Sequence, residues 1–207
     1  MKKFLILFLS LLLTLPLAAC GGKTVSEQEA IQTRLAEMEG YSAKASLTRQ
    51  TPFGERTYET LQYYKADGEY RLELTAPKEA AGNYTVFDGR RICQYNPRVD
   101  RSIIRDVPVS QQRNELFLGS FIENYLRSEG VTLEISSLDR SKCVVMEAVI
   151  PGNDPMLASE KLWVDRESLL PVRFVLYDAK GEEYCRMEYS EFVFDPAFEA
   201  GLFTIEE

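Results

Sequence analysis

The chain has 207 residues, of which 24 are basic and 32 acidic, and 45% of its residues are hydrophobic. The formal net charge of −8 argues against nucleic acid as a partner, because nucleic-acid-binding surfaces are strongly basic. The sequence contains no histidine, which removes the usual general base, the usual zinc ligand and every Ser-His or Cys-His nucleophile pair. We therefore expect a protein that is not an enzyme and that holds neither a cofactor nor a metal ion.

The N-terminus has the pattern of an export signal. Lys2 and Lys3 precede an uncharged, mostly apolar run over residues 4–17, which is too short to span a bilayer comfortably. The run ends in the tetrapeptide LAAC, which resembles the lipobox of bacterial lipoproteins and contains Cys20. We interpret Cys20 as the site of lipid attachment; the alternative is an ordinary secretory signal with a cysteine there by chance.

This interpretation divides the chain into three parts. Residues 1–19 are the signal peptide, residues 20–25 the lipidated tether and residues 26–207 a single domain. The mature protein has 22 basic residues against 32 acidic ones, a formal charge of −10. We expect it to be exported and anchored by Cys20 to the outer face of the cytoplasmic membrane.

The domain begins with a predicted amphipathic helix. Ser26 and Glu29 form a capping-box pattern, and Gly40 ends the apolar periodicity. Between them, three apolar residues recur at helical spacing: Ile31, Leu35 and Met38.

Further along, the period changes to two, which is typical of half-buried strands. Apolar residues alternate with polar ones in two clear stretches: Tyr70, Leu72 and Leu74, then Val131, Leu133 and Ile135. Turn signals separate the strand-like stretches at Pro52-Phe53-Gly54, Asp67-Gly68, Asp88-Gly89 and Lys180-Gly181. The pattern predicts a meander of antiparallel hairpins, with Asp88-Gly89 as a type I′ turn between residues 84–87 and 92–95.

A second helix is predicted between Ser110 and Gly130. An apolar face repeats there at helical spacing, formed by Leu118, Phe121, Ile122 and Tyr125 and widened by Leu116, Phe117 and Leu126. Such a face needs a large apolar surface to cover it, and a curved sheet would provide one. The single tryptophan, Trp163, is expected in the core.

Three cysteines remain once Cys20 is acylated: Cys93, Cys143 and Cys185. All three lie in strand-like stretches, so we expect buried free thiols. One intramolecular disulfide between any two of them is the alternative. A metal site is disfavoured because no CxxC spacing is present.

Four segments in order along the chain resemble the periplasmic lipoprotein-carrier superfamily: GEYRLELTAP, VFDGRRICQYNP, LWVDRESLLPVRFVLYDAKG and FVFDPAFEAGLF. The resemblance implies a mainly β fold, in which a strongly curved antiparallel sheet, an unclosed β-barrel, is covered by two amphipathic helices. Its concave face can hold acyl chains or a partner segment. Candidate concave-face residues are Leu72, Leu74, Phe121, Ile122, Tyr125 and Phe174.

The anchored, histidine-free chain looks most like the clostridial germination lipoproteins. That resemblance implies a role in modifying spore-cortex peptidoglycan through a partner amidase, and a location in the intermembrane space of the forespore. Two alternatives stay open: a lipid or lipoprotein carrier that uses the concave face as an acyl pocket, and an envelope sensor that resembles the guards of anti-sigma factors. A homo-oligomer is compatible with all three.

One charge feature indicates a docking surface. Five arginines fall within sixteen residues that contain a single acid, Asp100: Arg90, Arg91, Arg98, Arg101 and Arg105. The tail from Asp178 to Glu207 has the opposite character, with nine acids against two basic residues. The arginines either pair with carboxylates on neighbouring strands or form a surface for an anionic partner.

Overall fold

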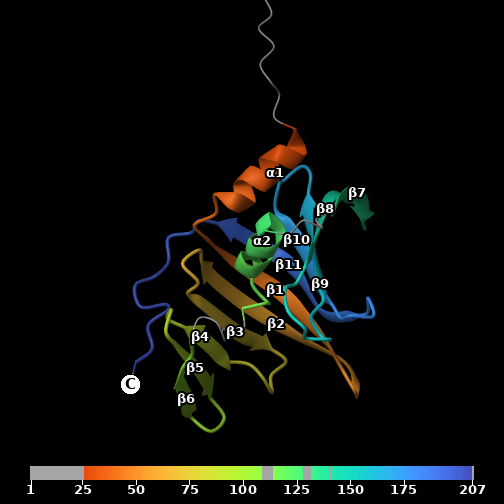
Figure 1. Cartoon of the computed structure of the whole chain (residues 1–207). Helices are drawn as coiled ribbons and strands as arrows, with labels where there is room; N and C mark the ends of the chain where they lie inside the picture. The colour runs from red at the N-terminus through yellow and green to blue at the C-terminus, as the bar shows by residue number, and fades with distance from the viewer. Residues whose placement is uncertain (1–25, 109–113, 128–131, 140, 207) are drawn as a thin grey trace, which may run out of the picture.

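The computed structural model describes residues 26–108, 114–127, 132–139 and 141–206. Within these ranges, eleven strands form one antiparallel sheet, and two helices lie against it (Figure 1). The helices are α1 Glu27–Ala36 and α2 Leu118–Arg127. The strands are β1 Gly40–Thr51, β2 Gly54–Lys65, β3 Tyr70–Ala76, β4 Tyr84–Phe87, β5 Arg91–Asn96, β6 Arg101–Asp106, β7 Thr132–Leu138, β8 Ser141–Val149, β9 Ser159–Asp165, β10 Pro171–Tyr177 and β11 Glu183–Phe194.

The strand order explains how a simple meander makes one sheet. Strands β1 to β6 run outward in sequence to one edge, and β7 to β11 run back from the other edge until β11 pairs with β1. The β1–β11 pairing therefore joins two meanders that are distant in sequence, Tyr41 lying opposite Phe194. The segment between β6 and β7 includes α2.

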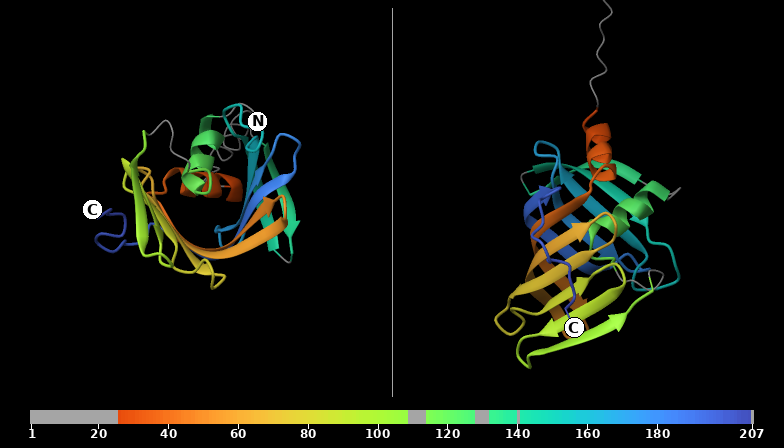
Figure 2. Two further views of the ribbon diagram at one scale, coloured as in Figure 1. Left: turned by 90° about the horizontal axis from the view of Figure 1, so that it is seen from below. Right: turned by 90° about the vertical axis from the view of Figure 1, so that its left-hand side faces the viewer.

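The sheet is bent into an open trough, and both helices lie on its inner side (Figure 2). The edges β6 and β7 do not pair with each other, so the barrel is not closed. The fold expected from the sequence, an unclosed antiparallel β-barrel covered by two helices, is confirmed.

The hairpin turns lie where the sequence predicts them. Gly54, Gly68, Gly89 and Gly181 all have positive φ angles, between +80° and +102°, which glycine adopts without steric cost. The turn type at β4–β5 differs from the prediction. The Asp88 N–H donates to the Arg91 carbonyl, so Gly89 and Arg90 are the central residues of the turn. Gly89 has φ +88° but Arg90 has no positive φ, so this is not a type I′ turn. The carboxylate of Asp88 instead accepts the backbone N–H groups of Arg90 and Arg91.

Helix α1 begins as predicted. The Ser26 hydroxyl accepts the Glu29 N–H, and the Glu29 carboxylate accepts the Ser26 N–H, which completes a capping box. The apolar face of the helix, with Ile31 and Leu35, is buried against the sheet.

Helix α2 is shorter than the predicted stretch from Ser110 to Gly130. It begins at Leu118, and Phe117 lies in the turn before it; residues 109–113 and 128–131 lie outside the described residues. Gly119 lets the helix approach β2 closely, because a Cβ at this position would collide with the hydroxyl oxygen of Tyr64.

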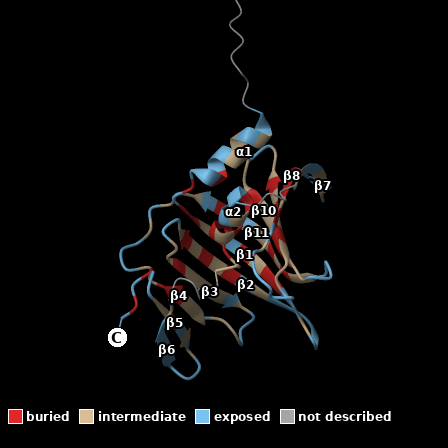
Figure 3. Cartoon of the chain, in the orientation of Figure 1, coloured by how far each residue is buried: buried red, intermediate tan, exposed pale blue. Residues whose placement is uncertain are grey.

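The core fills the trough beneath the helices (Figure 3). Two expectations about burial are wrong. Trp163 is only half-buried, because Leu162 and Val164 occupy the inner face of β9 and Trp163 points to the outer face. Ile135 is 57% exposed, because β7 is an edge strand beyond the cover of the helices; Val131, predicted with it, lies outside the described residues.

The segment after β11, residues 195–206, crosses to the outer side of the trough (Figure 2). There Ile205 packs with Val86 and Cys93 in a small second cluster. Within the described parts of the chain, no helix is long and apolar enough to cross a membrane.

Candidate functional site

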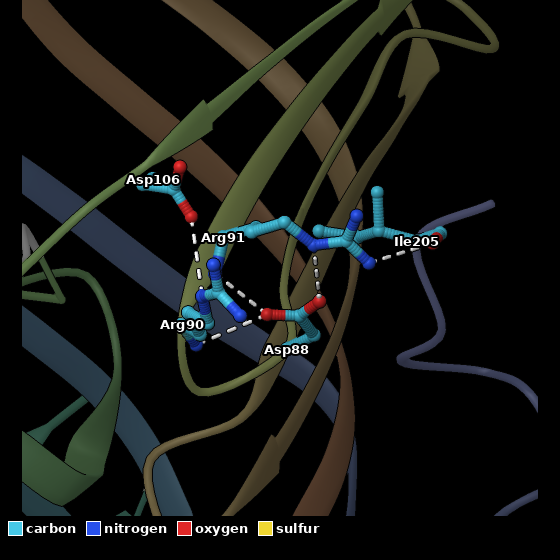
Figure 4. Close-up of polar contacts among 5 residues, drawn as sticks. All are labelled: Asp88, Arg90, Arg91, Asp106 and Ile205. Atoms are coloured by element: carbon cyan, nitrogen blue, oxygen red, sulfur yellow. Dashed lines mark hydrogen bonds and ion pairs between the residues drawn. The ribbon is translucent and has the colours of Figure 1, made fainter. Parts of the chain in front are cut away.

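The structure separates the five arginines of the predicted docking surface into two groups. Arg90 and Arg91 are paired (Figure 4). Arg90 forms an ion pair of 3.2 Å with Asp106 on the neighbouring strand. Arg91 pairs with Asp88 at 3.2 Å and donates to the backbone carbonyl of Ile205 at 3.0 Å. Arg91 therefore attaches the C-terminal segment to the β4–β5 hairpin and has a structural role.

The other three arginines, Arg98, Arg101 and Arg105, are exposed. Among the described residues, no carboxylate lies within ion-pair distance of any of them, and Arg105 has only a long hydrogen bond, 3.5 Å, to Gln94. Two exposed apolar side chains lie among them, Val99 at 61% and Ile103 at 58%. We call Arg98, Val99, Arg101, Ile103 and Arg105 the β6 arginine surface.

Strand register places part of this surface on the concave side. Arg101, Ile103 and Arg105 lie opposite Asn96, Gln94 and Ile92 of β5, and directly opposed residues in an antiparallel pair point to one face. The same face continues through Thr85 to Leu72. A hollow of about 570 Å³ lies here, lined by Leu72, Leu74, Thr85, Gln94, Arg101 and Ile103 among others.

A second hollow lies between the two helices. It has a volume of about 330 Å³ and is mostly apolar, with Phe121, Ile122 and Tyr125 of α2 facing Leu35 of α1. The Gln32 amide donates to the Tyr125 hydroxyl at 3.0 Å, which links the helices at its rim.

The six candidate concave-face residues therefore lie in three places. Leu72 and Leu74 line the hollow beside β6, and Phe121, Ile122 and Tyr125 line the groove between the helices. Phe174 lines neither, because it is fully buried against Phe121, with ring centroids 5.7 Å apart. The trough beneath α2 is filled by side chains.

Ion pairs neutralise part of the negative charge of the acidic tail. Four of its carboxylates on and after β11 take part in ion pairs: Glu183 with Arg186, Glu188 with Arg173, Glu191 with Lys44 and Asp195 with Arg34. Among the described residues, the three arginines of the β6 arginine surface are the unpaired members of the basic cluster between Arg90 and Arg105.

One buried ionisable residue was not predicted. Glu160 is 1% exposed on the inner face of β9, where it accepts a hydrogen bond of 2.7 Å from the Asn124 amide of α2. Burial raises the pKa of Glu160 to about 7, and the Asn124 hydrogen bond partly opposes this rise. The sequence did carry a signal, since Glu160 is in phase with the core residues Leu162 and Val164.

The cysteines are as expected from the sequence: Cys93, Cys143 and Cys185 are buried and free. Burial raises the pKa of Cys185 to about 12, so its thiol is protonated and unreactive at neutral pH. In the described part of the chain, no group of three or more acidic or cysteine side chains is placed to hold a metal ion. Cys20 lies outside the described residues.

Comparison with known proteins gives a family and a set of similar folds. A curated relative, sporulation protein YdcC of Bacillus subtilis, is 21% identical over 203 residues, which is 98% of this chain. The chain spans about 60% of that protein's length.

Among solved structures, an uncharacterized conserved protein from Thermus thermophilus has a TM-score of 0.55 at 15% identity, covering 87% of this chain and 94% of that one. The other matches include a LolA superfamily protein from Nitrosomonas europaea, with a TM-score of 0.44 at 15% identity, 86% of this chain and 97% of that one. They also include the CwlD amidase of Clostridioides difficile in complex with the GerS lipoprotein. This match has a TM-score of 0.44 at 24% identity and covers 83% of this chain and 92% of that one.

The family model described as sporulation protein YdcC-like matches residues 1–203, nearly the whole chain. The chain belongs to this YdcC-like sporulation family.

Proposed function

We propose that this protein is a non-enzymatic, lipid-anchored lipoprotein that binds a partner protein through the β6 arginine surface. The observation that carries the proposal is the group of three exposed arginines without carboxylate partners among the described residues. They lie beside the exposed apolar residues Val99 and Ile103. A basic surface with apolar residues in it, on a chain of net charge −8, fits an acidic protein surface.

The candidate partner is a cortex peptidoglycan amidase acting during sporulation. Membership of a sporulation family supports the setting, and the sequence resemblance to germination lipoproteins implies this class of partner. The protein would hold or activate the amidase at the outer face of the membrane and would not itself cleave peptidoglycan.

The test is the association rate with the amidase as a function of ionic strength. Arg98→Glu, Arg101→Glu and Arg105→Glu together should slow association at low salt by about tenfold or more and flatten its salt dependence, because electrostatic attraction accelerates encounter. The melting temperature should change little, since exposed charges contribute little to stability.

A matched control carries the same change in charge elsewhere. Arg56, Lys142 and Lys180 are exposed and lie on other strands and turns. Replacing these three with glutamate should slow association much less. Equal slowing by both triple variants would show that net charge alone matters and would remove the β6 arginine surface from the interface.

The anchor has its own test, because thioether acylation requires the Cys20 sulfur. Wild-type protein should partition into detergent and show the mass of the acyl groups. Cys20→Ala should leave an unprocessed precursor or a soluble form. Wild-type protein that stays in the aqueous phase without the added mass would overturn the lipoprotein assignment.

The groove between α1 and α2 favours one alternative, an acyl-chain carrier. Its volume of about 330 Å³ lies at the lower end of the range for ligand pockets, about 300 to 1,000 Å³. Mass spectrometry of lipids extracted from the purified protein separates the two functions. A bound lipid lost on Ile122→Trp, with amidase association unchanged, would support the carrier.

A further inference from the structure

Strand β6 is a free edge of the sheet. Among the strands that the structure describes, it pairs with β5 alone and ends the strand order. All six of its residues, Arg101–Asp106, are exposed, including Ile103 and Ile104. An uncovered edge of this kind presents backbone groups to which another extended chain can bind.

The hydrogen-bond pattern shows which backbone groups are free. The Val107 N–H donates to the Arg90 carbonyl at 2.9 Å, and hydrogen-bonded and non-hydrogen-bonded pairs alternate along an antiparallel ladder. Residues 101, 103 and 105 therefore direct their N–H and C=O groups to β5. Ser102, Ile104 and Asp106 direct theirs outward, along the edge.

The side chains on the concave face belong to the residues whose backbone groups point to β5. Arg101, Ile103 and Arg105 share the concave face, whereas Ile104 points to the convex face. An added strand would place its own residues directly opposite them, about 5 Å away between Cβ atoms. Its best complement on the concave face is an acid, an apolar residue and an acid at alternate positions.

We propose that the β6 edge binds an extended segment of the partner protein by strand addition, and that this segment has the pattern acid-x-apolar-x-acid. The inference rests on the proposed function and specifies how the partner binds. Backbone hydrogen bonds to Ser102, Ile104 and Asp106 supply affinity, and Arg101 and Arg105 supply the preference for acids. The pattern reads the same in both chain directions.

A second copy of this chain fits the edge poorly. A two-fold axis that continues the sheet keeps both concave faces on one side, and two registers overlap equally, one centred on Ile103 and one on Ile104. The first places Arg101 directly opposite Arg105 of the second copy, and like charges directly opposed destabilise strand pairing. The second places Arg105 opposite Ile103 of the second copy, with arginines of that copy diagonal to it and no acid facing any arginine of the concave face. Both registers leave these arginines without a carboxylate, which favours an acidic segment from another protein.

The test on this chain uses Ser102, which is exposed and whose N–H points outward. Ser102→Pro removes that donor without breaking the ladder to β5, because proline is tolerated at outward positions of edge strands. Ser102→Ala retains the donor and is the matched control. Partner binding should weaken about tenfold or more in Ser102→Pro and stay within about twofold in Ser102→Ala.

A synthetic peptide provides the second measurement and does not depend on how well Ser102→Pro folds. The probe is a labelled heptapeptide, Thr-Glu-Val-Ile-Thr-Glu-Thr, followed by fluorescence anisotropy. N-methylation of its valine and central threonine removes donors aimed at β6, whereas N-methylation of its isoleucine changes an amide that points away. Binding should be lost with the first modification, kept with the second, and weakened at least about tenfold when lysine replaces both glutamates.

The outcomes separate this inference from the proposed function. In one outcome, the arginine variants slow amidase association, Ser102→Pro does not, and N-methylation leaves peptide binding unchanged. This result would keep the docking surface and overturn strand addition. Association unaffected by both sets of variants overturns both. No binding of the unmodified peptide, with normal partner binding by Ser102→Pro, shows that the arginines only protect the edge from aggregation.

Discussion

The two ends of the sheet differ in which face is covered. Under the helices, the concave face is buried, and Leu118, Phe121 and Phe174 have no exposed surface. At the β4–β6 end, the concave face is open, and the convex face is covered by the C-terminal segment through Ile205. Beyond that segment, β6 is exposed on both faces (Figure 3).

The difference shows that one kind of strand can serve two purposes. Where helices cover the sheet, alternating apolar residues form the core and stabilise the fold. Where no described residue covers the sheet, β6 presents Ile103 and Ile104 together with arginines. We expect variants at the covered end to change stability, and variants at the β6 end to change binding.

The largest effect should follow from truncation at the covered end. Phe121 packs against Phe174 and Tyr125 and has no exposed surface, so Phe121→Ala should lower the free energy of unfolding by about 3 to 5 kcal/mol. Ile103→Ala, at the open end, should lower it by less than about 0.5 kcal/mol. Urea denaturation followed by circular dichroism measures both. Similar losses in the two variants would contradict the contrast between the ends.

A smaller effect depends on pH. Burial raises the pKa of Glu160 from 4.5 to about 7, so the folded state binds a proton more tightly than the unfolded state. The contribution of Glu160 to stability is complete below pH 4.5 and is lost as the pH rises to about 7.

Glu160→Gln keeps the size of the side chain and removes its ionisation. At pH 8 the variant should exceed the wild type in free energy of unfolding by on the order of 2 to 3 kcal/mol, and at pH 4 the two should be similar. Urea denaturation across this pH range provides the measurement. A constant difference between the two proteins at every pH would show that Glu160 does not titrate in the folded state.

The smallest effect distinguishes two adjacent arginines at the β4–β5 turn. Arg91 holds the Ile205 carbonyl and pairs with Asp88, so Arg91→Ala should cost about 1 to 2 kcal/mol of folding stability. It should also speed alkylation of Cys93, which the C-terminal segment covers. Arg90, whose side chain is 80% exposed, is the control, and Arg90→Ala should cost less than about 0.5 kcal/mol.

Two readouts check this pair: urea denaturation and the rate of thiol labelling under native conditions. Equal labelling of Cys93 in both variants would mean that Arg91 does not hold the C-terminal segment in place. Labelling of unfolded, unreduced wild-type protein should reach Cys93, Cys143 and Cys185 alike, since all three are free.

Much of the fold could be predicted because its signals are local. The glycines at the hairpin turns, the Ser26–Glu29 capping box and the apolar face of α2 each depend on residues close in sequence. The burial of Trp163 and Ile135 was predicted wrongly, because both depend on what covers a given face of the sheet. Local pattern shows that a strand has two faces, but it does not say which face is covered.

The candidate site shows the same division. Its arginines are visible as a cluster in the sequence, but only the structure separates Arg90 and Arg91, which are paired, from the three on the β6 arginine surface. Glu160 has the phase of a core residue, but only the structure shows the burial that raises its pKa and the hydrogen bond from Asn124 of α2 that partly opposes this rise.

The sequence by itself determined the mainly β class, the hairpin turns, the two helices and the position of the basic cluster, because each follows from the spacing and chemistry of residues near one another in the chain. Only the tertiary structure decided that β11 closes onto β1 and that β6 is left as a free edge. It also decided that the C-terminal segment covers the outer face near Cys93. These features depend on contacts between residues far apart in sequence. The free energy of each contact depends on which apolar surfaces meet when the whole sheet curves around its helices.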